Sequence, residues 1–238
     1  RTLTEVRAIF IHHKVPKEAG GGQIDLIAAQ LRAALTDRLS IIATKDGFAT
    51  SSNTLIDDGW ADVTLGLKYN LFRDPLNQQL LSAGVWYELP VGSDRTLQAQ
   101  GDGDFHVFLS GGALLCEDWH WVSGTGFRLP ANRSQGSQMW YWSNHIDRKI
   151  GDCVYALAEF NWYHWMRSGD GGLVGVEGGD LFNFGSRAVA GNDIVTGALG
   201  VKVKPADNME VGVAWELPLT DRRDVIHDRL TVDFIVRY

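Results

Sequence analysis

Three groups of side chains in this 238-residue chain are of types that enzymes and metal sites use. The run Ser143-Asn144-His145 combines a hydroxyl, an amide and an imidazole, which are the components of a serine hydrolase. Alternation along a strand turns Asn144 to the opposite face and leaves the Ser143 and His145 side chains about 6–7 Å apart, beyond hydrogen-bond reach. We therefore expect no catalysis here, and a lipid hydrolase is the most distant function considered.

The other two groups are candidates for metal binding. His12-His13 begins a predicted loop, but no third ligand follows at a suitable spacing, and paired loop histidines are usually solvated. Asp170, Glu177 and Asp180 lie in a glycine-rich segment that could bind Ca²⁺, although a flexible acidic loop explains them more simply. The sequence thus predicts no catalytic residue, no metal site and no cofactor.

The composition excludes some classes of protein. The formal net charge is −7 and the basic residues form no cluster, so no nucleic-acid partner is expected. Apolar residues make up 45% of the chain, but no run of about 18 consecutive apolar residues predicts a transmembrane helix. The chain has 27 glycines, 6 prolines and 9 tryptophans, which favours strands joined by turns.

Period-two alternation dominates the sequence. From Leu230 to Tyr238 the even positions are apolar, whereas the odd positions between them are polar except for Ile235. An outer membrane barrel produces this pattern because one face contacts lipid and the other lines a polar lumen. The alternation predicts about twelve strands, near residues 3–12, 24–35, 39–46, 61–71, 79–89, 105–115, 119–129, 138–150, 153–166, 195–203, 209–217 and 229–238.

The connections alternate strictly between short and long. The long ones occupy residues 13–23, 47–59, 90–103, 130–137, 167–191 and 218–228. Short periplasmic turns and long external loops are typical of outer membrane barrels, and an even strand number puts both termini at the short-turn end. We therefore expect one domain, residues 1–238, folded as an all-β transmembrane antiparallel up-and-down barrel of the bacterial outer membrane with periplasmic termini.

Aromatic residues are expected to form two girdles where the barrel meets the two membrane interfaces. The girdle near the long loops would comprise Trp60, Trp86, Tyr87, Phe127, Trp140, Trp142, Trp162, Trp165 and Trp215. The girdle near the short turns would comprise Tyr69, Phe72, Trp119, Trp121, Tyr155 and Tyr238.

Two hairpins of the chain repeat one another. Leu65-Gly66-Leu67-Lys68-Tyr69-Asn70 precedes a strand ending Trp86-Tyr87-Glu88-Leu89-Pro90, and residues 199–204 precede a strand ending Ala214-Trp215-Glu216-Leu217-Pro218. Residues 58–69 with Glu88-Leu89-Pro90-Val91-Gly92 resemble the outer-membrane meta-pathway phenol-degradation family, with departures at Ala61 and Val91. This resemblance covers about 60 residues and implies a barrel that passes small, often aromatic or hydrophobic, molecules. The final Tyr238 resembles the C-terminal signal that the barrel-assembly machinery recognises.

Strand parity places charges of both signs inside the predicted barrel. Arg7 and Asp233 should lie close together where the last strand closes against the first. The charges suit a narrow lumen, so an outer-membrane channel or transporter for small solutes is the first hypothesis. The alternative is a lumen plugged by salt bridges in a structural or partner-binding barrel, a component of an envelope complex. The expected pore-lining residues are Arg7, Arg32, Lys68, Glu88, Arg128, Asp147, Glu159, Lys202, Glu210, Glu216 and Asp233.

Overall fold

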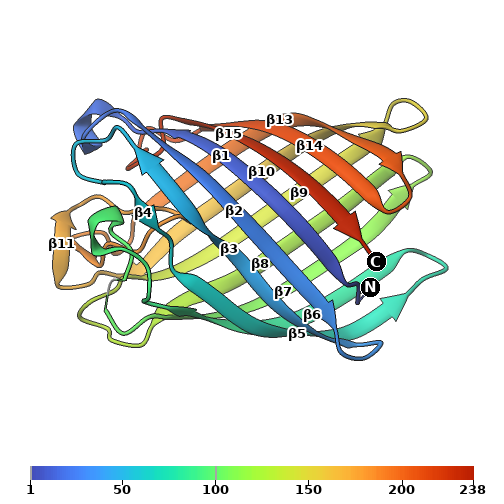
Figure 1. The fold of residues 1–238 in the computed structure, drawn as a ribbon, viewed down its shortest axis with the longest axis horizontal. Coiled ribbons are helices and arrows are strands. Elements are labelled where there is room, and N and C mark those ends of the chain that lie inside the picture. The colour runs from blue at the N-terminus through green and yellow to red at the C-terminus, as the bar shows by residue number, and fades with distance from the viewer. Residues whose placement is uncertain (1, 100) are drawn as a thin grey trace.

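The computed structural model describes residues 2–99 and 101–238, without the side chains of residues 45, 172 and 173. Twelve long strands form one closed antiparallel barrel (Figure 1). They are β1 (Glu5–Lys14), β2 (Gln23–Ala34), β3 (Leu39–Ser51), β5 (Val63–Asp74), β6 (Gln79–Leu89), β7 (Asp104–Cys116), β8 (Trp119–Pro130), β9 (Gln138–Lys149), β10 (Val154–Arg167), β13 (Asp193–Ala206), β14 (Met209–Pro218) and β15 (Asp228–Arg237).

The remaining elements are short and lie in the long loops. The strand β4 (Gly59–Trp60) pairs with the outer part of β3, and β11 (Gly171–Val174) pairs in parallel with β12 (Ser186–Arg187). Two 3₁₀ turns, η1 (Lys17–Ala19) and η2 (Asp94–Thr96), complete the list of elements in the described chain. No helix among the described residues is long and apolar enough to cross a membrane.

The barrel closes between the last strand and the first. Every residue of β1 has a partner on β15, from Glu5 opposite Arg237 to Lys14 opposite Asp228. The Nε atom of Arg7 lies 2.7 Å from a carboxylate oxygen of Asp233, so the expected proximity of these two residues is confirmed. The closed ring gives every long strand a partner on both sides, as a bilayer requires. The shortest of these ladders joins β3 and β5, where only Leu39–Ile42 pair with Gly66–Tyr69.

The predicted asymmetry of the connections is confirmed. Both termini lie at the end of the barrel that carries the short turns, and the long loops gather at the opposite end (Figure 1). Several predicted strand boundaries differ by two or three residues, and the largest difference is in β3, which continues to Ser51 instead of ending at residue 46. The outer part of β3 remains paired with β2, where Ile24 lies opposite Ser51.

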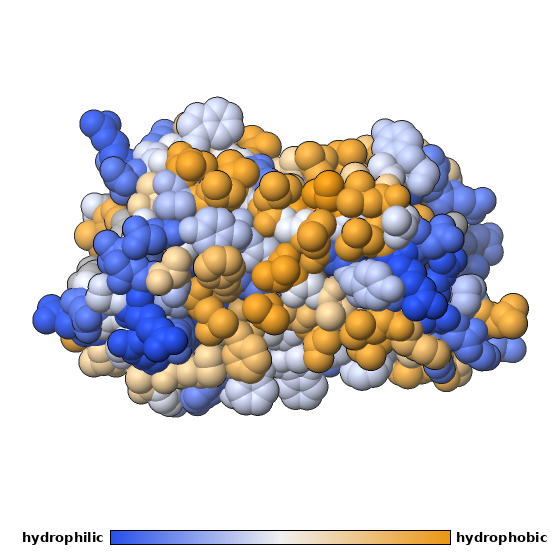
Figure 2. All heavy atoms as spheres, turned by 90° about the horizontal axis from the view of Figure 1, so that it is seen from below, coloured by the Kyte–Doolittle hydropathy of each residue, from blue (hydrophilic) through white to orange (hydrophobic). Residues whose placement is uncertain are grey.

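The outer wall of the barrel is apolar. On β5, Val63, Leu65 and Leu67 are 42%, 55% and 46% exposed, whereas Thr64 and Asn70 of the same strand are buried inside. The same parity holds on β7, β13 and β14, as predicted. Figure 2 shows hydrophobic residues over the middle of one face and hydrophilic residues toward both ends. An apolar belt of this kind matches the hydrocarbon region of a bilayer.

The prediction of an outer aromatic girdle is wrong for two tryptophans. Trp60, Trp140, Trp142 and Trp215 are exposed, but Trp165 is only 1% exposed. Trp86 also points inward, and its ring stacks on His106 of β7. Strand parity therefore decides which way an aromatic side chain points, whatever its preference for a membrane interface.

The alternation of faces predicts which positions contact lipid. Cysteines replacing Leu65 and Val201 should carry fluorophores that spin-labelled lipids quench, because both side chains lie on the outer wall. Cysteines at Ser143 and Thr231, which line the central cavity, should carry fluorophores that resist this quenching. The native thiols Cys116 and Cys153 are first replaced by serine. The opposite pattern would contradict a membrane-spanning barrel.

Candidate functional site

The lumen near the short turns contains a network of ion pairs, which we call the charge belt. Glu5 contacts Arg32 at 3.2 Å and Arg237 at 3.3 Å, and Arg237 contacts Glu210 at 3.2 Å. Glu210 lies 3.8 Å from the Nζ atom of Lys202. These contacts connect β2, β1, β15, β14 and β13 across the inner wall of the barrel.

The belt continues through Asp147 to three further strands. A carboxylate oxygen of Asp147 lies 2.6 Å from the Nζ atom of Lys202, and the histidines His120 and His145 contact the same carboxylate at 2.8 and 3.2 Å. The other ring nitrogen of His145 contacts Glu159 at 2.7 Å. Paired charges explain how so many ionised groups are tolerated in a narrow lumen.

A cavity of about 270 Å³ lies beside the charge belt. Arg7, Glu159, Lys202, Glu210 and Asp233 are among its lining residues. The belt therefore follows the wall and leaves space within the inner half of the lumen. Lys68 of β5 also lies on the inner face, and it forms no ion pair among the described residues.

A larger cavity of about 330 Å³ occupies the centre of the barrel. Its wall combines charged groups with aromatic rings and a few small polar groups. The lining includes Arg7, Arg128, Glu159, Glu216, Arg229, Trp86, Tyr141, Tyr163, Ser143 and Asn161. Such a wall can contact an aromatic ring and hydrogen-bond a polar substituent at the same time.

The loop between β10 and β13, residues 168–192, folds into the outer half of the lumen. Two arginines of the wall hold it there. Arg128 donates to the carbonyl oxygens of Phe182, at 3.1 Å, and of Gly179. Arg229 contacts Asp180 of the loop at 2.7 Å and Glu216 of β14 at 3.4 Å. The sequence did not predict this inward course.

Apolar side chains of the loop fill one side of the outer lumen. Phe182 and Phe184 are 5% and 6% exposed and pack in one cluster with Ile9, Ile11 and Leu26 of the wall. The general pattern of outer membrane barrels predicted a lumen that is polar throughout. This prediction is wrong for the outer half, which contains the apolar cluster. The inward-facing positions of β1 change from Glu5 and Arg7 to isoleucines as the strand passes from the short-turn end to the loop end.

The acidic residues of this loop have structural roles that differ from one another. Glu177 is fully buried and accepts hydrogen bonds from the Ser137 hydroxyl at 2.6 Å and from the backbone N–H groups of Phe184 and Ser186 at 3.1 and 2.8 Å. Asp180 is bound to Arg229 instead, as described above. Glu177 and Asp180 therefore do not form the Ca²⁺ site that the sequence analysis considered.

The other chemistry-bearing residues of the sequence are also separated. His12 contacts Asp25 at 2.6 Å, whereas its neighbour His13 is buried and accepts a hydrogen bond from Arg229. Ser143 lines the central cavity, and both ring nitrogens of His145 contact carboxylates of the charge belt. Neither the histidine pair nor the Ser143-His145 pair is arranged as a shared site.

Four cavities follow one another along the lumen, and each shares lining residues with the next. A mouth cavity of about 20 Å³ precedes an outer cavity of about 110 Å³, then the central and inner cavities already described. The mouth and outer cavities share Asp62, Glu88 and Gln98. The outer and central cavities share Thr44, Trp86, His106 and Asp180, and the central and inner cavities share Arg7, Glu159 and Thr231.

Loss of Glu177 should release the inward loop. The change Glu177→Ala removes a buried acceptor of four hydrogen bonds, and hydrogen bonds to a charged group each contribute about 1.5–3 kcal/mol. We expect trypsin to cut after the exposed Arg187 at least about tenfold faster in this variant, measured by mass spectrometry. Asp170→Asn, at an exposed position of the same loop, is the control. Equal cleavage rates would show that Glu177 does not anchor the loop.

Removing the carboxylate of Asp147 should destabilise the barrel. Asp147→Ala leaves Lys202, His120 and His145 without the group they share, and breaking a buried ion pair costs about 3–5 kcal/mol. Urea unfolding in lipid vesicles, followed by tryptophan fluorescence, measures the loss. The change Asp152→Asn in an exposed turn is the control, and adding Lys202→Met to the Asp147 variant should restore part of the stability.

Comparison with known proteins shows similarity of fold without similarity of sequence. The chain matches no protein-family model and no curated protein. Among solved structures, the COG4313 outer membrane channel from Pseudomonas putida F1 is 13% identical over 100% of this chain and 96% of its own, with a TM-score of 0.63. The NanC porin has a TM-score of 0.60 at 9% identity, covering 99% and 98% of the two chains, and the KdgM porin has 0.56 at 10%, covering 98% and 99%. The twelve-stranded fold of this chain is thus that of outer membrane barrels, and these structures do not identify the phenol-degradation family.

Proposed function

We propose that this protein is a channel of the bacterial outer membrane that passes small solutes through a narrow lumen with charges of both signs. The observation that carries the proposal is the series of four cavities with shared lining residues, from the mouth to the inner cavity. A barrel that served only as a scaffold has no need of such a series. The solved barrels of similar fold that are named as channels and porins support the same function.

The outer wall supports the location. Its apolar belt requires a hydrocarbon environment, and the closed ring of strands is one of the two structures that can cross a bilayer. Outer membrane barrels place short turns in the periplasm and long loops outside. We therefore place both termini, which lie at the short-turn end, in the periplasm, and the 168–192 loop at the external mouth.

The central cavity supports a class of solute. Its volume of about 330 Å³ accommodates a small molecule, and Trp86, Tyr141 and Tyr163 offer aromatic faces beside polar groups such as Ser143. The mouth cavity, at about 20 Å³, has room for about one water molecule. A small aromatic or weakly polar solute therefore suits the centre of the lumen, and the inward loop must move for it to pass. The resemblance of residues 58–69 to the phenol-degradation family points to the same class.

A plugged barrel that binds a protein partner is the second candidate. The apolar cluster around Phe182 and Phe184, with the arginine anchors of the loop, favours it, because a stable plug blocks passage. The long loops would then form the partner surface. Conductance in a planar lipid bilayer distinguishes the two candidates.

Release of the loop from the wall should enlarge the channel. The change Arg128→Ala removes the donors to Phe182 and Gly179, so the loop loses one of the two arginines that hold it to the barrel wall. We expect small single-channel conductance from the wild-type protein and a conductance at least about twofold higher from the variant, since conductance follows the narrowest section. Heat-modifiable migration on gels shows whether each protein is folded.

The control for this experiment is Arg95→Ala, which removes an exposed arginine of another external loop. Its conductance should equal that of the wild-type protein. If folded wild-type protein and folded Arg128→Ala both fail to conduct and to swell proteoliposomes, the plugged barrel replaces the channel as the proposed function.

A further inference from the structure

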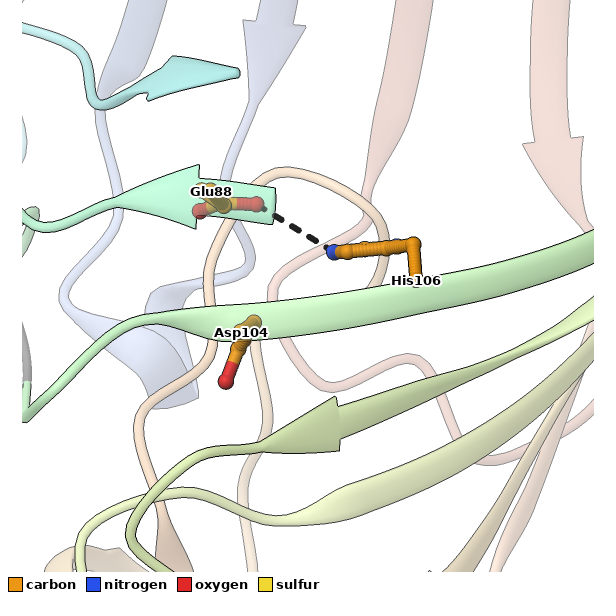
Figure 3. Close-up of side chains that lie close together, drawn as sticks. All are labelled: Glu88, Asp104 and His106. Carbon is orange, nitrogen blue, oxygen red and sulfur yellow. Dashed lines mark ion pairs between the residues drawn. The ribbon is translucent and has the colours of Figure 1, made fainter. Parts of the chain in front are cut away.

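A cluster of metal-binding side chain types lies on the inner face of β6 and β7, near the external mouth. One potential ligand atom from each of Glu88, Asp104 and His106 lies within 4.8 Å of the other two. Glu88 is directly opposite Asp104 in the ladder, and His106 follows Asp104 by two residues on the same face. Figure 3 shows Glu88 and His106 pointing toward one another from adjacent strands, with Asp104 beside them on β7. The three side chains thus come from two paired strands of the wall, at the end that faces the long loops.

His106 has a buried ring nitrogen that lacks a hydrogen bond. The residue is 9% exposed, and its Nε2 atom has no hydrogen-bond partner among the described residues. Its contact with Oε2 of Glu88, at 3.4 Å, is an ion pair (Figure 3) and not a hydrogen bond. The ring stacks on Trp86, with centroids 5.1 Å apart and planes at 27°, which fixes its orientation. A cation between the imidazole and the carboxylates would satisfy this nitrogen.

The surroundings of the cluster are acidic. The mouth cavity of about 20 Å³, which has room for one water or one ion, is lined by Asp62, Glu88, Asp102 and Asp104. Four carboxylates of like charge around so small a volume repel one another. A bound cation would relieve this repulsion.

One cation of the protein already lies near the cluster. The Nε atom of Arg128 is 4.0 Å from Oδ2 of Asp104, which also accepts a hydrogen bond from Asn183. The terminal nitrogens of Arg128 are directed to the loop carbonyls. Both contacts to Asp104 use Oδ2, and a carboxylate has a second oxygen with which to bind a cation.

We propose that Glu88, Asp104 and His106 bind a divalent transition-metal ion of the Zn²⁺ class at the external mouth of the lumen. One imidazole nitrogen with two carboxylate oxygens suits such ions, whereas Ca²⁺ and Mg²⁺ prefer oxygen ligands alone. Three protein ligands leave a coordination position for water or a solute. Because Glu88 lines both the mouth and the outer cavity, the ion would lie along the lumen. Metal binding at this site does not require that the protein conduct solutes.

Cobalt binding tests the proposal on the folded protein. The full chain is stripped with chelator in detergent micelles and titrated with Co²⁺, followed by its visible absorption, and Zn²⁺ is then added as competitor. We expect one Co²⁺ per chain, displaced by Zn²⁺. His106→Gln and Glu88→Gln should each weaken binding at least about tenfold, since even partners outside the ligand set alter affinity by about 10–100-fold.

The matched control is His145→Gln, because His145 also contacts two carboxylates in the lumen but lies beside Lys202 in the charge belt. It should bind Co²⁺ as the wild-type protein does. The proposal fails if no saturable absorption develops, or if folded His106→Gln and Glu88→Gln bind as tightly as His145→Gln. If His106→Gln does not fold, Glu88→Gln and Asp104→Asn decide the question. Conductance is measured separately, so failure of the metal site and failure of the channel are distinguishable.

Discussion

Closure of the strand ring is the constraint on which the rest of this structure depends. A bilayer offers no partner for a free N–H or C=O group, so an open sheet edge cannot be left in it. The pairing of all ten residues of β1 with β15 removes that edge. Once the ring is closed, each strand has one face toward lipid and one toward a lumen of limited width. The outer face must be apolar because it contacts lipid. The internal charges and the inward loop must fit within the limited width of the lumen.

The charges inside the ring are tolerated because they are paired. Around the short-turn end the charge belt distributes them along the wall, from Arg32 through Glu5 to Glu159, and a cavity remains beside it. At the loop end the charges of the wall are paired with the loop instead: Arg128 and Arg229 bind groups of the inward loop. Apolar side chains fill the space between the loop and the wall. The two ends therefore differ: the inner half is lined by paired charges beside a cavity, and the outer half is narrowed by the loop.

The predicted site residues all face inward, because parity alone assigns a strand residue to one face. Parity could also have identified Asp104, His106 and Arg229, which alternate with apolar neighbours in the same way. Strand parity could not predict contacts between strands that are not neighbours. Asp147 of β9 contacts Lys202 of β13, although β10 lies between these strands, and this contact depends on the curvature of the wall and the length of the lysine side chain. The predicted outer girdle included Trp86 and Trp165 because they are aromatic, although the parity of their strands already placed both side chains inside.

The sequence by itself determined the number of strands, the ends at which short and long connections lie, and the face on which each strand residue sits. These properties are local, because alternation and turn residues act within a few positions of the chain. Only the tertiary structure decided what the lumen contains. The course of residues 168–192, the anchoring of Glu177 and the convergence of Glu88, Asp104 and His106 depend on the radius and register of the closed ring. Those quantities arise from all twelve strands together, and no single segment of the sequence specifies them.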